Sequence, residues 1–203
     1  MKLYTLPKHK YQPRAFTLIE LLVVITIIGI LAAMAFPGAS AVLGKARRAG
    51  AKNQALQVRS AISAYYTEYR RYPIQGGSAG GDQQVQTNNV LMDVLLGAQG
   101  NPLNPRGIAF FAGKQARGGG ANAKGGLVMS GNGGGLLVDP WGMQFNVILD
   151  TNFDNRVLAP FSKSGNAGGN NIVPDSVIVW SLGPDAGVGG SGNPLVKDYI
   201  TTW

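Results

Sequence analysis

Few side chains in this sequence are suited to covalent or metal chemistry. The chain contains no cysteine, and its only histidine is His9. Without cysteine there is no disulfide framework and no thiol nucleophile, and a single histidine cannot form the usual zinc centres. Chemistry by lysine or by carboxylates alone stays possible, although no spacing of such residues indicates it. The sequence therefore predicts a protein that is not an enzyme.

One carboxylate, Glu20, occupies an unusual position. It is the only charge in residues 16–36, which read FTLIELLVVITIIGILAAMAF, and residues 21–44 form a run of 24 residues without any charge. As a helix this run is about 36 Å long, enough to cross a bilayer core of about 30 Å. A carboxylate near one end of an apolar helix is costly unless it has a partner, so Glu20 is a candidate functional residue.

Basic residues precede this apolar segment. The leader carries Lys2, Lys8, Lys10 and Arg14 and no acid. A basic flank of this kind stays on the cytoplasmic side of a membrane. The helix is therefore expected to cross the membrane once, with its C-terminal end pointing outward.

The N-terminal segment, A-FTLIELLVVITIIGILAAMAFP, resembles the class III signal of type IV pilins and of the pseudopilins of type II secretion. In that family a prepilin peptidase cuts before the phenylalanine and methylates the new N-terminus. The resemblance implies a cut between Ala15 and Phe16, an assembly role for Glu20 and a helix-bending role for Pro37. The family usually has glycine before the cut, so an alanine there is expected to slow cleavage. A cut chain has neither histidine nor cysteine, which removes Ser-His-Asp catalysis.

Two other interpretations of the N-terminus remain open. An ordinary secretory signal has a basic start, an apolar core and an A-x-A site, and Ala33-Met34-Ala35 is such a site. Against it, the apolar run is long and Glu20 would interrupt its start. A plain membrane anchor without assembly explains everything except Glu20 and the spacing of FTLIE.

Residues 16–71 are predicted to form one long helix with soft points at Gly29, Pro37 and Gly44. A proline inside a helix removes one hydrogen bond and bends it. From residue 51 onward the apolar positions follow one helical face. They are Ala51, Ala55, Val58, Ile62, Tyr65 and Tyr69. This apolar stripe indicates that the second half of the helix packs on a globular domain.

The segments after this helix predict a small domain. Residues 87–96 are expected to form a short helix, with Thr87 or Asn88 as its N-cap and Gly97 just past its end. Strands are predicted at residues 143–149, 177–181 and 198–203. A helix followed by antiparallel strands is typical of an α+β fold, here a long pilin-like helix packed on a small antiparallel sheet.

Residues 113–135 contain ten glycines together with Lys114, Arg117 and Lys124. Neither GxxxxGK[ST] nor a GxGxxG that leads from a strand into a helix is present, so the segment is not a phosphate-binding loop. Long loops without structure are usually functional or disordered. We therefore predict a mobile loop here.

The net charge of +8 is concentrated in two segments. The leader contributes +4 and residues 45–71 contribute +6, whereas Glu20 and residues 72–203 each contribute −1. Nucleic-acid binding needs a basic patch on the folded face, so nucleic acid is not a predicted partner.

Three later segments are similar to the major pseudopilin of type II secretion. They are DPWG at residues 139–142, WSLGPD at residues 180–185, and the ending D-x-I-x-x-W, whereas the glycine-rich insert departs from that family. The resemblance implies a structural subunit of a type II secretion pseudopilus, which drives protein export across the outer membrane. A type IV pilin subunit for adhesion, motility or DNA uptake is the alternative, and a membrane-tethered enzyme is a third class.

The resemblance also implies the organisation of the chain. Residues 1–15 would be the leader, residues 16–44 the transmembrane and assembly half of the helix, and residues 45–203 a periplasmic domain. The protein is expected in the bacterial inner membrane and then in the pseudopilus. Expected partners are further copies in a helical homopolymer, the prepilin peptidase, the inner-membrane assembly platform, minor pseudopilins and membrane lipid. Glu20 would pair with the new α-amino group of Phe16 in a neighbour, which sets register more than it adds stability.

The resembling pseudopilins also bind calcium in a C-terminal loop. Carried over residue by residue, the ligands would be the carboxylates of Asp185 and Asp198 and the carbonyl of Leu182. Calcium prefers such oxygen ligands. The family often has a second acid where this chain has Lys197, whose charge would weaken the site. In the alternative interpretation, Asp185 only caps a turn and Asp198 only begins a strand.

Overall fold

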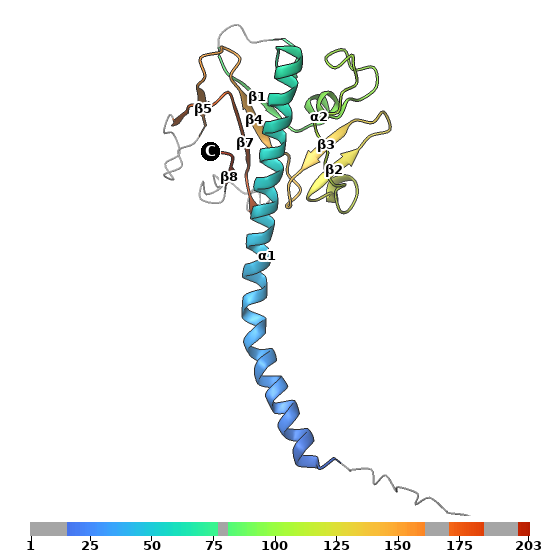
Figure 1. Cartoon of the computed structure of the whole chain (residues 1–203), viewed down its shortest axis with the longest axis vertical. Coiled ribbons are helices and arrows are strands. Elements are labelled where there is room, and N and C mark those ends of the chain that lie inside the picture. The colour runs from blue at the N-terminus through green and yellow to red at the C-terminus, as the bar shows by residue number, and fades with distance from the viewer. Residues whose placement is uncertain (1–15, 77–80, 161–170, 185–198) are drawn as a thin grey trace, which may run out of the picture. The chain divides into compact units, whose positions relative to one another are not determined.

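The structure is a computed structural model that describes residues 16–76, 81–160, 171–184 and 199–203, with the backbone alone at residues 35–41. The chain separates into two compact units, Met1–Gly44 and Lys45–Trp203, and one long helix contributes to both. Figure 1 labels this helix α1, together with the short helix α2 and most strands of the second unit.

Helix α1 spans Leu18–Tyr69. It continues through Pro37, so the prediction of one long helix over residues 16–71 is confirmed. The helix ends where Arg70 adopts a left-handed conformation with φ of 52°. The backbone N–H of Arg70 donates to the carbonyl of Tyr66 at 2.8 Å, which closes the last turn.

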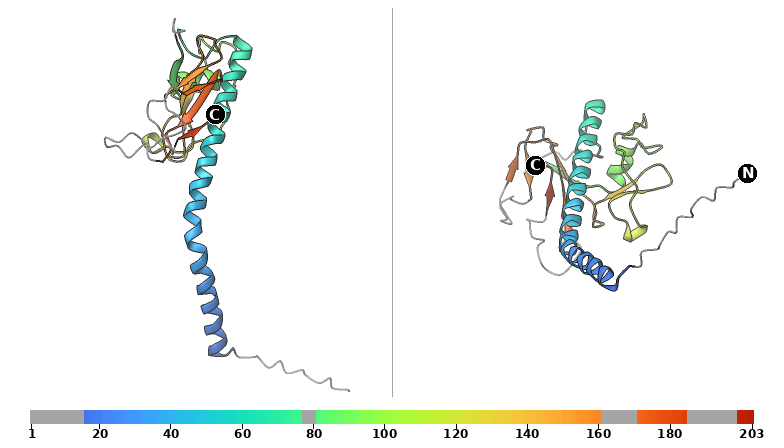
Figure 2. Two further views of the ribbon diagram at one scale, coloured as in Figure 1. Left: turned by 90° about the vertical axis from the view of Figure 1, so that its left-hand side faces the viewer. Right: turned by 60° about the horizontal axis from the view of Figure 1, so that its bottom comes forward.

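The apolar stripe in the second half of α1 lies in the main core, as predicted. Five of its residues are fully buried and the sixth, Tyr69, is partly buried. The fully buried ones are Ala51, Ala55, Val58, Ile62 and Tyr65. Figure 2 shows in a second view that this half of the helix lies along the strands of the domain.

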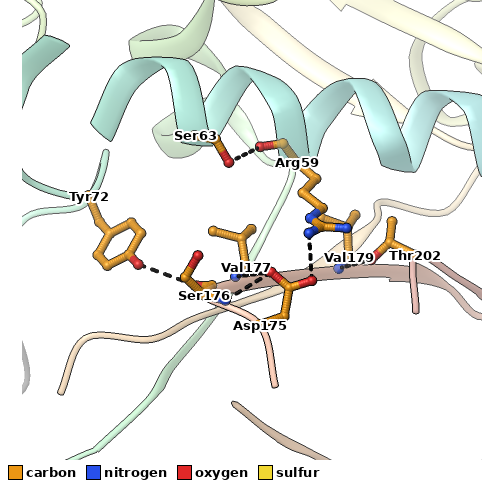
Figure 3. A network of polar contacts seen from close by, with 8 residues as sticks. All are labelled: Arg59, Ser63, Tyr72, Asp175, Ser176, Val177, Val179 and Thr202. Atoms are coloured by element: carbon orange, nitrogen blue, oxygen red, sulfur yellow. Dashed lines mark hydrogen bonds and ion pairs between the residues drawn. The ribbon is translucent and has the colours of Figure 1, made fainter. Parts of the chain in front are cut away.

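Polar contacts also fasten this part of the chain to the segment before strand β7 (Val177–Ser181). Figure 3 shows Arg59 of α1 paired with Asp175, at 2.6 Å between guanidinium and carboxylate. The hydroxyl of Tyr72, just beyond the helix, donates to the carbonyl of Ser176 at 3.3 Å. Both contacts hold the C-terminal half of α1 to the sheet.

The main sheet has four antiparallel strands in the order β1-β4-β7-β8. Their bounds are Gln83–Gln86 for β1, Asn146–Leu149 for β4, Val177–Ser181 for β7 and Ile200–Thr201 for β8. The α+β prediction is therefore confirmed. The three predicted strands are present, although β4 and β8 are shorter than expected, and the polar strand β1 was not predicted.

Both faces of the sheet are covered. Val147 and Val179 pack in the core beneath α1, while Ile148 and Ile178 pack in a second core on the other face. The second core is completed by the antiparallel pair β5 (Val157–Ala159) and β6 (Asn171–Val173). Strands β4 and β7 are consequently buried at every position, which removes the alternation of apolar and polar residues that marks a one-sided strand.

Helix α2 spans Asn89–Leu96 and confirms the predicted short helix. The side chain of Asn88 accepts the N–H of Leu91 at 3.2 Å and so caps the helix. At the other end, Gly97 takes the left-handed conformation with φ of 73°, and a Cβ there would lie 2.6 Å from the carbonyl oxygen of Gly107. Glycine is required at this position for both reasons.

The glycine-rich segment is ordered, so the prediction of a mobile loop at residues 113–135 is wrong. It contains strand β2 (Gly126–Met129), which pairs antiparallel with β3 (Gly135–Val138), and a 3₁₀ turn at Gly120–Asn122. Several glycines serve turns at positive φ, and others allow backbones to approach closely. A high glycine content suggests disorder, but in this segment the glycines allow tight turns and close contacts between backbones.

Candidate functional site

The start of helix α1 is closed by Thr17 and Glu20. The hydroxyl of Thr17 accepts the backbone N–H of Glu20 at 3.3 Å. In return, one carboxylate oxygen of Glu20 accepts the backbone N–H of Thr17 at 2.9 Å and its hydroxyl at 2.8 Å. This reciprocal arrangement is a capping box. Glu20 therefore has a partner within its own chain, which the Thr-x-x-Glu spacing would have revealed and which the sequence analysis missed.

The described side chains in the first half of α1 are exposed. Every residue from 16 to 34 is exposed, including Phe16 at 83%, Leu18 at 86% and Ile19 at 70%. Among the residues whose side chains are described, no helix combines the length and the apolar character needed to cross a membrane. An apolar surface of this extent marks a site of interaction with a protein or a membrane.

The structure places only some of the predicted site residues. Phe16 and Glu20 lie at the start of α1, and the backbone of Pro37 lies within that helix. Ala15, Asp185 and Asp198 lie outside the described residues, so the structure does not test the predicted cleavage site or the predicted calcium ligands.

Leu182, the third predicted calcium ligand, is half-buried and packs against the second core. In the described ranges, no three or more Asp, Glu or His side chains are grouped so that they could hold a metal ion. The calcium site stays a prediction.

Asp139, the first residue of DPWG, is buried, and its carboxylate accepts hydrogen bonds from two segments of the chain. One carboxylate oxygen accepts the backbone N–H groups of Trp141, Gly142 and Met143, each at 2.9 Å. The other accepts the hydroxyl of Ser181 at 2.5 Å. Burial raises the pKa of Asp139, although these hydrogen bonds, led by that of Ser181, act to lower it.

Ser181 extends this connection to the next segment. Its hydroxyl oxygen also accepts the backbone N–H of Gly183 at 3.0 Å. A single buried carboxylate thus joins the DPWG turn to the start of SLGPD, two segments that are 42 residues apart. The sequence analysis recognised both motifs and missed their contact, because an aspartate before Pro-x-Gly is more often an exposed turn residue.

Comparison with known proteins agrees with the architecture of the N-terminal helix. Residues 12–36 match the family model described as the prokaryotic N-terminal methylation motif. The fimbrial protein EcpC of Eikenella corrodens is 39% identical over 71 residues, which is 35% of this chain and 46% of that protein. No solved structure matches the chain.

Two further relatives belong to different systems. The type II secretion system core protein G of Pectobacterium carotovorum is 38% identical over 63 residues, or 31% of this chain and 40% of that protein. The type IV major pilin protein PilE1 of Neisseria gonorrhoeae is 40% identical over 67 residues, or 33% of this chain and 41% of that protein. The chain thus spans less than half the length of each of these curated relatives.

The chain thus combines an N-terminal methylation motif at residues 12–36 with a long helix that continues into an α+β domain. Its N-terminal third is similar both to type IV pilins and to a type II secretion core protein.

Proposed function

We propose that this chain is a subunit of a type II secretion pseudopilus. The observation that carries the proposal is the pair of segments DPWG and WSLGPD, joined through Asp139 and Ser181. These segments are similar to the major pseudopilin of type II secretion, and one relative is itself named a type II secretion core protein. A type IV pilin subunit is the second candidate, because relatives named as pilins match at comparable identity.

In the proposed mechanism the prepilin peptidase cuts between Ala15 and Phe16, and the uncharged run of residues 21–44 holds the subunit in the inner membrane before assembly. The domain then lies in the periplasm. Glu20 leaves its contacts with Thr17 and pairs with the α-amino group of Phe16 in the neighbouring subunit. The exposed apolar faces exchange lipid for other copies of the helix as the filament grows. The inner-membrane platform and minor pseudopilins would take part in this growth.

Mass spectrometry of the protein purified from its host tests the processing step. We expect an N-methylated Phe16 as the first residue. A mature chain that begins at Phe36 would indicate an ordinary signal peptidase and would remove the pilin-type mechanism.

A deletion strain separates the two candidate functions. We expect loss of exported proteins from the medium, with normal surface pili, and restoration by the intact gene. Loss of surface pili, twitching or DNA uptake with unchanged export would instead establish the pilin function. No enzymatic role is proposed, since the relatives are structural subunits.

We also propose that calcium binds near the C-terminus through Asp185, Asp198 and the carbonyl of Leu182. Support comes from the family resemblance and from the fixed start of this loop, where Ser181 is held by Asp139. Calcium should raise the melting temperature of the detergent-solubilised chain, and Asp185→Ala should abolish the rise. Equal melting with calcium and with chelator would exclude the site.

A further inference from the structure

The ordered glycine-rich segment presents a cluster of positive charge. We call residues 114–124 the basic arm, because its three cations, Lys114, Arg117 and Lys124, are all exposed. Residues 113–135 contain no acid. The ion pairs of the described residues join Arg59 to Asp175 and Arg106 to Glu68, and leave the arm unpaired.

Two of these cations directly face each other. Arg117 and Lys124 form an antiparallel bridge in which each backbone N–H donates to the other carbonyl at 2.9 Å. Like charges at directly opposite positions destabilise a strand pair. The basic arm therefore keeps an unfavourable arrangement that a negatively charged partner would relieve.

Glycines fix the shape of the basic arm. Gly118 has φ of +77°, and a Cβ there would lie 2.7 Å from the carbonyl oxygen of Asn122. Gly126, at the base, would place a Cβ 2.5 Å from the carbonyl oxygen of Lys114. The backbone of the basic arm is therefore ordered, and it holds the three cations at defined positions.

A complementary surface lies near the C-terminal end of α1. A pocket of about 360 Å³ is lined by Tyr66, Tyr72, Phe153 and Asp150, together with polar groups of neighbouring residues. We call it the aromatic pocket. Tyr72 and Phe153 stack with ring centroids 6.0 Å apart and planes 14° apart, and Tyr66 lies 5.1 Å from Tyr72. No lysine or arginine is among the described residues that line it.

Phe153 is held in this pocket against its own conformational preference. It has φ of 61° and is 59% exposed. A bulky residue rarely adopts a positive φ, and it does so only where its surroundings impose that conformation. Asp150 imposes it, because its two carboxylate oxygens accept the N–H groups of Asp154 at 3.2 Å and of Asn155 at 2.8 Å.

The electrostatic character of the aromatic pocket favours a cation. Burial, with further contributions from Asp150, Tyr66 and Asp175, raises the pKa of Tyr72 to about 12, so its hydroxyl stays neutral. Figure 3 shows this hydroxyl directed at Ser176. Aromatic faces beside a carboxylate are a site for a guanidinium or ammonium group.

We propose that the basic arm of one copy docks its cations into the aromatic pocket of the next copy. Figures 1 and 2 show the β2–β3 hairpin, from which the arm extends, on one side of the second half of α1, and β5 on the other side. Contacts between two different surfaces are heterologous and produce open helical filaments when they do not close into a ring. The proposal therefore rests on the proposed role of this chain as a filament subunit.

Crosslinking between introduced cysteines tests the docking directly. Because the chain has no cysteine, thiols at Gly119→Cys in the arm and Thr67→Cys at the pocket report the designed contact and leave its cations and rings in place. A short bismaleimide is suitable, since an arginine side chain separates the two backbones by more than a disulfide spans. In cells that assemble filaments, the double variant should give a ladder of dimers, trimers and larger species. Mixing the two single variants should stop the ladder at dimers.

The control pair replaces the arm position by an exposed cation of α1, with Lys45→Cys and Thr67→Cys. A ladder from this pair and none from the first pair would overturn the proposal. Filaments without a ladder from Gly119→Cys and Thr67→Cys overturn the docking alone. Failure of the unmodified chain to form filaments would contradict the proposed function instead.

A charge reversal separates docking from folding. Arg117→Glu turns the opposed cations into an opposed ion pair, so the melting temperature should rise slightly. Filament yield should nevertheless fall about tenfold, as expected for loss of a desolvated cation–aromatic contact. Lys52→Glu, an equally exposed change on α1, should leave the yield unchanged. Normal yield from Arg117→Glu would contradict the proposal.

Discussion

Asp139 shows how one buried residue determines local structure over a long sequence distance. Its carboxylate accepts three backbone N–H groups of the DPWG turn and the hydroxyl of Ser181. A buried donor left without an acceptor costs about 1–3 kcal/mol. The charge of Asp139 therefore matters less than the geometry of its two acceptor oxygens.

We expect Asp139→Ala to lower the free energy of unfolding by about 2–4 kcal/mol, because several buried donors lose their acceptor. Asp139→Asn keeps one carbonyl oxygen for the three N–H groups and should cost about 1 kcal/mol. Urea unfolding of the detergent-solubilised chain measures both. Equal losses in the two variants would contradict this explanation.

Comparison of the native chain with Asp139→Asn gives a prediction about pH dependence. The pKa of Asp139 is raised above its ordinary value of 3.8, so the folded chain holds this proton more tightly than the unfolded chain does. The corresponding stability is present below that value and is lost as pH rises through the raised pKa. As pH rises from 3.8 through the raised pKa, the difference in unfolding free energy between the native chain and Asp139→Asn should therefore shrink.

At the level of the elements, side-chain periodicity decided what the sequence could predict. The apolar stripe from Ala51 to Tyr69 correctly predicted the second half of α1. The N-cap at Asn88 and the glycine at Gly97 correctly predicted α2. Strand β1, with the sequence QQVQ, carries no apolar alternation, and β2 and β3 offer only the runs LVM and LLV, too short between glycines to show a period. The sequence indicated the motifs of the candidate site, but the contact between Asp139 and Ser181 depends on pairing that only the folded chain supplies.

The end of α1 offers a test of backbone strain. Arg70 occupies a left-handed position with φ of 52°, where glycine has no steric penalty. We expect Arg70→Gly to raise the free energy of unfolding by about 0.5–1 kcal/mol. Thermal unfolding would show this as a higher melting temperature.

Lys52→Gly is the matched control, because it is an exposed position within the same helix. It should be destabilising by about 1 kcal/mol. A decrease in melting temperature with Arg70→Gly would show that the arginine side chain contributes more than its backbone conformation costs.

On the scale of the whole molecule, charge and apolar surface are separated along the chain. Residues 16–34 present an exposed apolar helix, and the basic arm presents three exposed cations. The first surface is suited to bringing many copies together and the second to fixing how they meet. Both uses require more than one copy, which agrees with a subunit of the pilin type.

Glu20→Ala should leave membrane insertion intact, because it removes a costly charge from the proposed span. It should reduce filament yield, because the α-amino group of Phe16 in a neighbour loses its partner. Immunoblots of membrane fractions and electron microscopy of sheared filaments measure the two effects. Normal filament yield from Glu20→Ala would refute the pairing.

The capping box between Thr17 and Glu20 has a consequence for the reversibility of growth. A carboxylate that already has two donors in its own chain exchanges partners when it enters a filament, and an exchange releases little free energy. Growth then depends on work supplied from outside the filament. We expect a filament of such subunits to shorten once this work is no longer supplied. Its length should then depend on how recently the work was supplied.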